Sequence, residues 1–357
     1  MLSRICLIFG TRPEIIKLSP IIRRARKRNI QTIFTGQHYD YDLGLKFIED
    51  LDLPSPNYKM ELTKNNSAMQ MGEIITKLSK ILQEIKTDTV MVQGDTNTVL
   101  AGAISALKSK IPLSHVESGL RSFDWRMPEE HNRILADHIS ELLFASTNTS
   151  RQNLVNEHVH GKIFVVGNTA IDALEQNLSI AEKKSSINID GEFSLLTLHR
   201  AENVDYKKTL SDIINGIIRS GERFVFPVHP RTKKRLSEFR LYEKIKESKN
   251  IIMTDAVGYF DIILLMKRCR LIVTDSGGIQ EEATSPKIRK KVLIARTSTD
   301  RPEAVEAGLS EIIGTNSDYI KKAIIRAINS PWHHKGNSPY GNGKTTEKIL
   351  KITDKYF

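Results

Sequence analysis

Short apolar segments alternate with segments of helical length along most of this 357-residue chain, and this alternation constrains the fold more than any other feature. The clearest unit lies in the first third of the chain. Two apolar runs, Thr89–Gln93 and Pro112–Glu117, flank one helix-length segment, Thr98–Lys108. Strand–helix–strand units of this kind build parallel sheets whose neighbouring strands are joined by crossover helices. The alternation therefore predicts an α/β fold.

Two series of this alternation follow each other, which indicates two doubly wound domains. In the first series, six strands are expected: Arg4–Phe9, Gln31–Thr35, Thr89–Gln93, Pro112–Glu117, Leu142–Ala145 and Ile163–Gly167. In the second, five are expected: Phe193–Leu198, Phe224–Val228, Ile251–Thr254, Leu271–Thr274 and Val292–Ala295. Residues 179–192 between them are polar and lack a consistent period, so we expect a connecting segment there.

The length of the chain also favours two domains, because it exceeds the usual size of one hydrophobic core. We predict a Rossmann-like N-terminal domain over residues 1–169, to which a C-terminal helix at residues 342–357 returns. A second Rossmann-like domain is predicted over residues 170–341. Clefts between domains are common ligand sites, so we expect the ligand of this chain in such a cleft.

Three carboxylates are expected at the carboxyl edge of the first sheet, where ligands of open parallel sheets bind. Asp95 follows one apolar run, Glu117 ends the next, and Glu129 opens the following helix, with Arg133 close by. Gathered acids push their pKa values apart, so one site can hold both a proton donor and an acceptor. A helix N-cap at Asp95 and an ordinary helix start at Glu129 are the structural alternatives. Three acids on one edge favour the catalytic interpretation.

The first expected strand leads into a turn, Gly10–Glu14, that begins a helix. Backbone N–H groups at a helix start, with Arg12 and Lys17 nearby, form an anion site. The turn is not a G-x-G-x-x-G fingerprint, so a dinucleotide cofactor is not indicated. After the second expected strand come Gln37 and His38, which belong either to the site or to an ordinary polar loop.

A phosphate cradle is predicted in the second domain at Ser276, Gly277 and Gly278, between a strand and a helix. Glycines let backbone N–H groups approach an anion, and the serine hydroxyl adds a donor. Glu282, one turn further on, could accept hydrogen bonds from the hydroxyls of a ribose. An ordinary glycine turn and a solvent-facing acid are the alternatives.

Cationic groups stand at other strand ends of the second domain. His199 and Arg200 follow one expected strand, and His229 follows the next. Such groups at a strand end can stabilise charge on a leaving phosphate. Arg301, which precedes a Pro-Glu helix start, is either a phosphate contact or part of a salt bridge.

The composition limits the kinds of partner, metal site and cellular location that this chain can have. The net charge is +11 and the isoelectric point about 9.4, which suits an anionic partner. Without zinc-finger or RNA-binding motifs, no nucleic-acid partner is expected. Two cysteines, Cys6 and Cys269, are too few for a cysteine metal site, and no metal is expected. We expect a cytoplasmic protein with no membrane partner, because no apolar run approaches ~18 residues and the start does not resemble a signal peptide.

Eight motifs, in this order, resemble those of the non-hydrolysing UDP-N-acetylglucosamine 2-epimerases. They are GTRPEIIK (Gly10–Lys17), QGDT (Gln93–Thr96), HVESGLR (His115–Arg121), PEEHNR (Pro128–Arg133), GNTAIDAL (Gly167–Leu174), LHRAEN (Leu198–Asn203), DSGGIQEEA (Asp275–Ala283) and RPEAVEAG (Arg301–Gly308). The resemblance covers nearly the whole chain. It implies a GT-B-like fold, meaning two Rossmann-like domains facing a deep cleft, and a homodimer without a cofactor.

The resemblance also implies a reaction and roles for the residues. The family interconverts UDP-GlcNAc and UDP-ManNAc by eliminating UDP and adding it back to a bound 2-acetamidoglucal, a step that serves polysaccharide biosynthesis. The implied acid/base residues are Asp95, Glu117 and Glu129, and the implied leaving-group stabilisers are His199 and Arg12. The implied substrate contacts are Lys17, Gln37, His38, Ser276, Gly277, Gly278 and Glu282. Where relatives carry an aromatic residue against the uracil, this chain has Ile262, so Tyr259 or Phe260 is expected in that role.

Three other reactions stay open at this point. A 2-epimerase of a UDP-diacetamido-uronic acid would need an added cation, for which Arg126 and the basic run Lys287–Lys291 are available. A GT-B glycosyltransferase would need the nucleotide site but not the three acids. A hydrolysing relative that releases free ManNAc would differ in how well its site excludes water.

Overall fold

The structure is a computed structural model that describes residues 2–37, 41–64, 66–185, 187–330, 332 and 336–357. The chain divides into two compact units. Unit 1 comprises the chain up to Ala173 together with Tyr340–Phe357, and unit 2 comprises Leu174–Pro339. Among the described residues, no helix is long and apolar enough to cross a bilayer.

Unit 1 is built on a seven-stranded parallel sheet of order β3-β2-β1-β4-β5-β6-β7. Its strands are β1 (Ile5–Phe9), β2 (Ile30–Phe34), β3 (Tyr58–Lys59), β4 (Thr89–Gln93), β5 (Leu113–Ser118), β6 (Leu142–Ala145) and β7 (Lys162–Val165). Six of them match the expected strands. The edge strand β3 was not predicted, because two residues show no periodicity. The strand order reverses between β1 and β4, so the carboxyl ends of these strands form a topological switch point.

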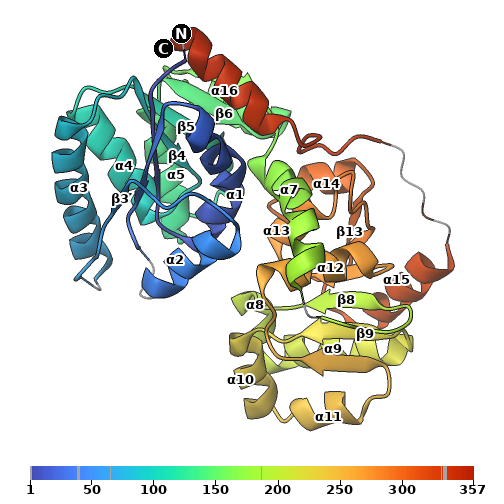
Figure 1. The fold of residues 1–357 in the computed structure, drawn as a ribbon. Helices are drawn as coiled ribbons and strands as arrows, with labels where there is room; N and C mark the ends of the chain where they lie inside the picture. Colours follow the sequence, from blue (N-terminus) through green and yellow to red (C-terminus); the bar gives the residue numbers. More distant parts are fainter. Residues whose placement is uncertain (1, 38–40, 65, 186, 331, 333–335) are drawn as a thin grey trace. The chain divides into compact units, whose positions relative to one another are not determined.

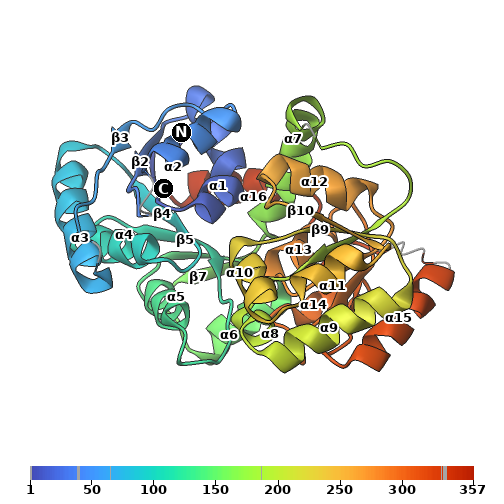
Figure 2. The ribbon, with the colours of Figure 1, turned by 90° about the horizontal axis from the view of Figure 1, so that it is seen from below.

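Helices cover this sheet as the crossover rule requires. They are α1 (Arg12–Ile22), the 3-10 helix η1 (Arg23–Lys27), α2 (Tyr41–Asp50), α3 (Ser67–Glu84), α4 (Asn97–Lys108), α5 (Pro128–His138), α6 (Asn148–Asn156) and the start of α7 (Thr169–Lys184). The small residues of α4 allow close packing: a Cβ on Gly102 would lie 3.0 Å from Val92 of β4. Figures 1 and 2 show α3 beside α4.

The last helix, α16 (Thr345–Tyr356), belongs to unit 1. Asp172 caps its start by accepting hydrogen bonds from the N–H groups of Thr345 (3.1 Å) and Thr346 (2.7 Å). Near its end, Asp354 accepts a hydrogen bond from the N–H of Ser3 (3.0 Å). Figure 1 accordingly shows the two chain ends next to each other. These contacts hold α16 on the N-terminal part of the chain.

The connecting segment predicted at residues 179–192 is wrong in its first part, because α7 runs through Lys184. Leu174, Leu178 and Ala181 recur at helical spacing and are buried in the core of unit 2. This spacing is typical of a helix, but the many polar residues between these apolar ones made the pattern hard to recognise in the sequence.

Unit 2 contains a six-stranded parallel sheet of order β10-β9-β8-β11-β12-β13. Its strands are β8 (Ser194–Thr197), β9 (Phe224–Pro227), β10 (Ile251–Thr254), β11 (Ile272–Thr274), β12 (Val292–Ile294) and β13 (Ser310–Ile312). Five match the expected strands, and the short edge strand β13 was not predicted. Its helices are α8 (Ala201–Val204), α9 (Lys207–Ser220), α10 (Pro230–Glu238), α11 (Tyr242–Glu247), α12 (Tyr259–Arg268), α13 (Gly277–Glu282), α14 (Pro302–Glu306) and α15 (Ser317–Asn329).

Both faces of the second sheet are buried, as is usual for parallel sheets. Adjacent residues of β8 show this, since Leu196 packs in a cluster with Ile213 of α9. Leu195 packs in a different cluster with Ile263 of α12. The helices therefore lie on both sides of the strands (Figure 1), and polar residues that must face a ligand are left to the strand ends.

Candidate active site

Asp95 lies just beyond the carboxyl end of β4. Gly94, with a φ of 84°, turns the chain after the strand, and the side chain of Thr96 caps α4. Asp95 is therefore not the N-cap, and its carboxylate is available for other contacts. It accepts a 2.5 Å hydrogen bond from Nη2 of Arg133, while the side chain of Asn132 donates to the Asp95 carbonyl (3.0 Å).

Glu117 lies within β5 at a shift of register between Val116 and Ser118. Its φ of 66° falls in the left-handed region, which non-glycine residues rarely adopt and which is often found at functional sites. The carboxylate accepts hydrogen bonds from Nζ of Lys17 (2.6 and 2.7 Å) and from Nε2 of Gln93 (2.5 Å). The β-bulge thus directs a buried carboxylate to a lysine of α1.

These two acids influence each other. Burial raises the pKa of Asp95 above its ordinary value, and the nearby charge of Glu117 adds to this rise. Arg133 and Lys17 oppose it. The structure therefore brings four of the predicted site residues together, each acid with its own cation, in a setting suited to proton transfer.

Glu129 is placed differently from the other two acids. Its side chain is exposed in the first turn of α5. The next residue, Glu130, is only 1% exposed. Its carboxylate accepts hydrogen bonds from the N–H and hydroxyl of Ser122 and from the N–H of Phe123 (2.9 Å each), and it pairs with Nη1 of Arg133 (3.1 Å). Glu130 was not among the predicted site residues.

The turn before α1 does not present a free set of amides. The Glu14 carboxylate accepts hydrogen bonds from the N–H groups of Gly10 (2.6 Å) and Thr11 (3.0 Å), so these two groups already have a partner. Burial raises the pKa of Glu14 to about 7, although these hydrogen bonds and that from Thr96 oppose the rise. The Arg12 guanidinium is exposed and lies 4.7 Å from the centre of the Phe47 ring.

Gln37 connects the end of β2 to the start of α4. Its side-chain oxygen accepts hydrogen bonds from the N–H and the hydroxyl of Thr98, both at 2.7 Å. Gln70 of α3 donates to its carbonyl (3.1 Å). His38, the next predicted site residue, lies outside the described residues.

A fully buried histidine supports the turn that carries Asp95. Nδ1 of His115 lies 2.7 Å from the Asp137 carboxylate, and Nε2 lies 2.8 Å from the carbonyl of Gly94. Burial by itself would lower the pKa of His115, but Asp137 and the Gly94 carbonyl raise it above its ordinary value. A carboxylate and a carbonyl both accept hydrogen bonds, so this arrangement favours a ring that donates from both nitrogens, which is the imidazolium form.

At the carboxyl edge of the second sheet, the central group is Asp275, which was not among the predicted site residues. It is fully buried and accepts hydrogen bonds from the N–H groups of His199 (3.0 Å) and Arg200 (3.0 Å) and from the side chain of Asn203 (3.1 Å). Nδ1 of His199 lies 3.2 Å from the same carboxylate. Burial alone would raise the pKa of Asp275, but these donors lower it. Asp275 therefore positions the two predicted cationic residues.

The two histidines of this edge lie together, with ring centres 5.7 Å apart. Nδ1 of His229 accepts a hydrogen bond from the N–H of Arg231 (3.2 Å) and so caps α10. Burial lowers the pKa of His229, and the charge of His199 lowers it further. His229 thus has a capping role, and its ring borders His199.

The predicted phosphate cradle begins α13, with Ser276 as its N-cap residue. A Cβ on Gly277 would lie 3.6 Å from the Asp300 carboxylate and 3.7 Å from Nη2 of Arg200, so charged groups surround this glycine. Gly278 is exposed, with no other group within 4 Å of its Cβ position. The space around the two glycines of this turn is therefore not crowded, and charged side chains are the groups nearest to Gly277.

Arginines gather on the same side of the turn. Arg301 is buried and pairs with Glu281 of α13 and with Asp300 (3.2 Å), and Arg296 also pairs with Asp300 (3.1 Å). Burial would raise the pKa of Asp300, but Arg301, Arg200 and Arg296 lower it. Of the two alternatives for Arg301, the salt bridge is present in the structure.

The last two predicted contacts are half-buried. Glu282 ends α13, and Tyr259 begins α12 with its ring centre 6.1 Å from that of Phe260. Within the described ranges, no group of three or more His, Cys, Asp or Glu residues could hold a metal ion.

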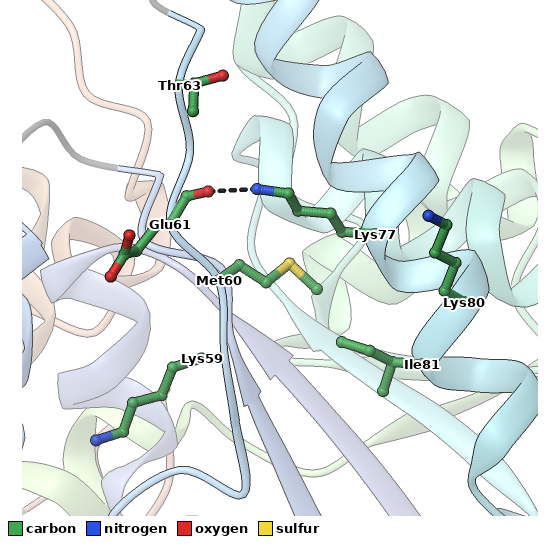
Figure 3. A pocket seen from close by; sticks show the side chains of 7 residues that line it. All are labelled: Lys59, Met60, Glu61, Thr63, Lys77, Lys80 and Ile81. Carbon is green, nitrogen blue, oxygen red and sulfur yellow. Dashed lines mark hydrogen bonds between the residues drawn. The ribbon is translucent and has the colours of Figure 1, made fainter.

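A pocket of about 560 Å³ lies in unit 1 between β3 and α3 (Figure 3). It is lined by Lys59, Met60, Glu61, Thr63, Lys77, Lys80 and Ile81. Lys77 donates a hydrogen bond to the Glu61 carbonyl, and Figure 3 shows Lys59 and Lys80 pointing in different directions. None of the predicted site residues lines this pocket.

Comparison with known proteins identifies the chain. Two Rossmann-like domains with parallel sheets define a GT-B-like fold. The family model for UDP-N-acetylglucosamine 2-epimerase matches residues 21–354. The chain belongs to this epimerase family, whose members are isomerases, as its eight motifs indicated.

Similar proteins cover almost the whole chain. The UDP-N-acetylglucosamine 2-epimerase of Methanocaldococcus jannaschii is 47% identical in an alignment of 363 positions that covers 98% of each chain. Its structure in complex with UDP-GlcNAc and UDP has a TM-score of 0.83 at 45% identity, with 99% of each chain covered. The enzyme of Neisseria meningitidis bound to UDP-GlcNAc has a TM-score of 0.82 at 31% identity, with 98% of this chain and 99% of that chain covered.

Proposed function

We propose that this protein interconverts UDP-GlcNAc and UDP-ManNAc by eliminating UDP and adding it back, with 2-acetamidoglucal as the bound intermediate. The observation that carries the proposal is the paired arrangement of Asp95 with Arg133 and of Glu117 with Lys17 at one sheet edge. Relatives named for this activity are similar over the full length of the chain.

Proton transfer at C2 is the difficult part of the reaction, because no carbonyl group stands next to that carbon. A base takes the C2 proton, the C–H electron pair forms the C1–C2 double bond, and the bond from C1 to the UDP oxygen breaks. Returning a proton to the other face of C2 and re-forming the C1–O bond gives the epimer. Asp95 and Glu117 suit these two proton transfers, since burial raises the pKa of Asp95 above its ordinary value and so favours its protonated form.

Glu129 is retained as a proposed third acid. Its exposure leaves it able to contact substrate, unlike the buried Glu130 beside it. Arg12, which is also exposed, is proposed as a cationic contact for the departing diphosphate. Gln37 is a proposed substrate contact near the switch point of the first sheet, and His38 is proposed as a further substrate contact.

Unit 2 supplies the groups proposed to hold UDP. His199, Arg200 and Arg301 provide positive charge at the strand ends, and Ser276–Gly278 provides backbone donors. Cations and N–H donors stabilise the negative charge that develops on a leaving diphosphate. Glu282 and Tyr259 are proposed for the ribose and the uracil, and His229 for positioning beside His199.

We also propose that the protein is a homodimer, the commonest symmetric assembly of soluble oligomers. The uronic-acid and glycosyltransferase alternatives are not favoured, because the relative at 47% identity is named for UDP-GlcNAc and the paired acids have no role in simple transfer. Light scattering of the purified protein tests the dimer, and a mass of one chain would contradict it.

Incubation with UDP-GlcNAc followed by proton NMR of the products tests the reaction. We expect the anomeric signals of UDP-ManNAc to grow to a constant ratio, with no free sugar. Free ManNAc would indicate the hydrolysing reaction, and an unchanged spectrum would contradict the proposal. The Asp95→Asn variant in the same buffer is the control. If the acid cluster forms the product, this variant should form much less of it.

A further inference from the structure

Glu130 is a buried carboxylate next to the proposed acids, and no step of the reaction uses it. Only 1% of the residue is exposed. Oε1 accepts a hydrogen bond from the N–H of Phe123, and Oε2 accepts from Ser122 and from Nη1 of Arg133. A buried carboxylate is costly unless it is fully hydrogen-bonded, and this one is bound by three neighbours.

Arg133 joins this carboxylate to Asp95. Its Nη1 lies 3.1 Å from Glu130 and its Nη2 lies 2.5 Å from Asp95. One guanidinium is therefore shared between two negative groups, which compete for its charge. The planar fork of an arginine suits such bridging, and its geometry ties the position of one carboxylate to the other.

We propose that Glu130 is a positioning residue that holds Arg133 between two carboxylates and thereby limits how strongly Arg133 stabilises the charged form of Asp95. The inference rests on the proposed role of Asp95. Without Glu130, the full charge of Arg133 would act on Asp95 and keep it ionised. With Glu130 in place, Asp95 can take up a proton as well as release one.

Other charges also face Asp95 and set the background for this effect. They are Arg133 of α5, Glu117 of β5, and Lys17 and Glu14 of α1. Lys17 is itself bound by Glu117, so Arg133 is the cation in direct contact with Asp95. Changing the partner of Arg133 is thus the most selective way to alter Asp95.

The test follows Asp95 directly by NMR. Protein labelled with ¹³C at the aspartate carboxyl carbons is titrated, and the Asp95 signal is assigned by its loss in Asp95→Asn. For Glu130→Gln we expect the Asp95 midpoint to fall by about one pH unit, since a nearby opposite charge shifts a carboxyl pKa by this order. For Arg133→Gln we expect it to rise. The acid limb of the kcat/KM profile for UDP-GlcNAc should move in the same directions.

Two further variants separate this role from a structural one. Asp124→Asn removes a charge of the same loop that pairs with Arg126, and it should leave the Asp95 midpoint unchanged. Ser122→Ala removes a hydroxyl that Glu130 binds while keeping all charges, so a shift there as large as in Glu130→Gln would overturn the proposal. If Glu130→Gln does not fold, Glu130→Asp, which withdraws the carboxylate from Arg133, should shift the midpoint in the same direction by less.

The two proposals can fail separately. An Asp95 midpoint that does not move in Glu130→Gln, or that moves upward, contradicts the role of Glu130 whatever the activity. Full turnover of Asp95→Asn contradicts the role of Asp95 in the reaction, while the titrations still decide whether Glu130 acts on it.

Discussion

The carboxyl edges of the two sheets share one geometry but carry opposite arrangements of charge. In unit 1, half-buried Asp95 has a second acid nearby, and its pKa is raised. In unit 2, Asp275 is more deeply buried, yet its pKa is lowered because backbone and side-chain donors surround it. Burial therefore does not decide the state of these two acids. The donors do, since hydrogen bonds to a carboxylate favour its charged form.

This contrast suits the two different tasks that we propose for the two sheet edges. An acid whose pKa is raised can exchange protons, which suits the edge of unit 1. An acid whose charge is fixed by donors, as Asp275 is, can hold His199 and Arg200 in place for an anion. The residue types at the strand ends make the difference, while the apolar strands behind them are alike.

The largest expected effect concerns the proton-transfer side of this comparison. Asp95→Asn should lower the rate of epimerisation at least ~100-fold, within the usual range for a general acid or base. The amide keeps the shape of the side chain but cannot accept the proton. Turnover is measured by NMR with UDP-GlcNAc, and near-wild-type rates would remove Asp95 from the mechanism.

On the anion-binding side, Arg200→Gln should weaken UDP binding by about 10-fold or more, since hydrogen bonds to charged groups contribute about 1.5–3 kcal/mol. Isothermal titration with UDP measures the change. Arg219→Gln, which breaks an exposed pair with Asp318 in the same unit, is the matched control and should bind UDP normally. Equal affinity of both variants would contradict the proposed role of Arg200.

Asp275→Asn should destabilise unit 2 by about 1–3 kcal/mol, because an amide cannot accept all of the hydrogen bonds that the carboxylate accepts. Since the folded-state pKa is lowered, the carboxylate contributes stability above its ordinary pKa, and this contribution is lost as the pH falls through the folded value. Urea unfolding at about pH 7 and about pH 3.5 should therefore show the difference between variant and wild type shrinking in acid. A difference that does not depend on pH would show that Asp275 is not held in its charged form.

The smallest expected effect is at His115, which supports the Asp95 turn. Its pKa is raised in the folded state, so its ion pair contributes stability below about pH 6.5 and loses it as the pH rises through the folded value. As the pH rises, the free energy of unfolding of the wild type should fall relative to that of His115→Gln. The expected fall is about 1.4 kcal/mol for each unit by which folding raises the pKa of His115. Unfolding at about pH 6 and about pH 9 measures this, and parallel curves would mean that His115 is not an imidazolium.

Much of the architecture of the two units could be predicted from the sequence, because the fold depends on the periodic spacing of apolar residues. Alternating apolar runs predicted eleven strands, and the two that were missed are short edge strands, β3 and β13. Polar residues after strand ends predicted that Asp95 and Glu117 lie at the same edge of the first sheet, where β4 and β5 are neighbours. Such positions follow from topology alone, since the strand order places them on one edge.

The partners of these residues could not be predicted in the same way. Glu129 and Glu130 are adjacent in sequence, and only the rotation of α5 against the sheet decides which is buried. Glu130, Arg133 and Asp137 recur at helical spacing and are buried, so a stripe was present, but charged residues are not expected in a core. Likewise, the occupation of the Gly10 amide by Glu14 depends on a side-chain conformation that no spacing reveals.

Exchange of the C2 proton with solvent tests the central claim most directly. UDP-GlcNAc is incubated with the protein in deuterium oxide, and the products are examined by NMR and mass spectrometry. Proton transfer by the acid cluster predicts one deuterium at C2 of the UDP-ManNAc formed and none at any other carbon. Epimerised product that keeps its original hydrogen at C2 would contradict the account.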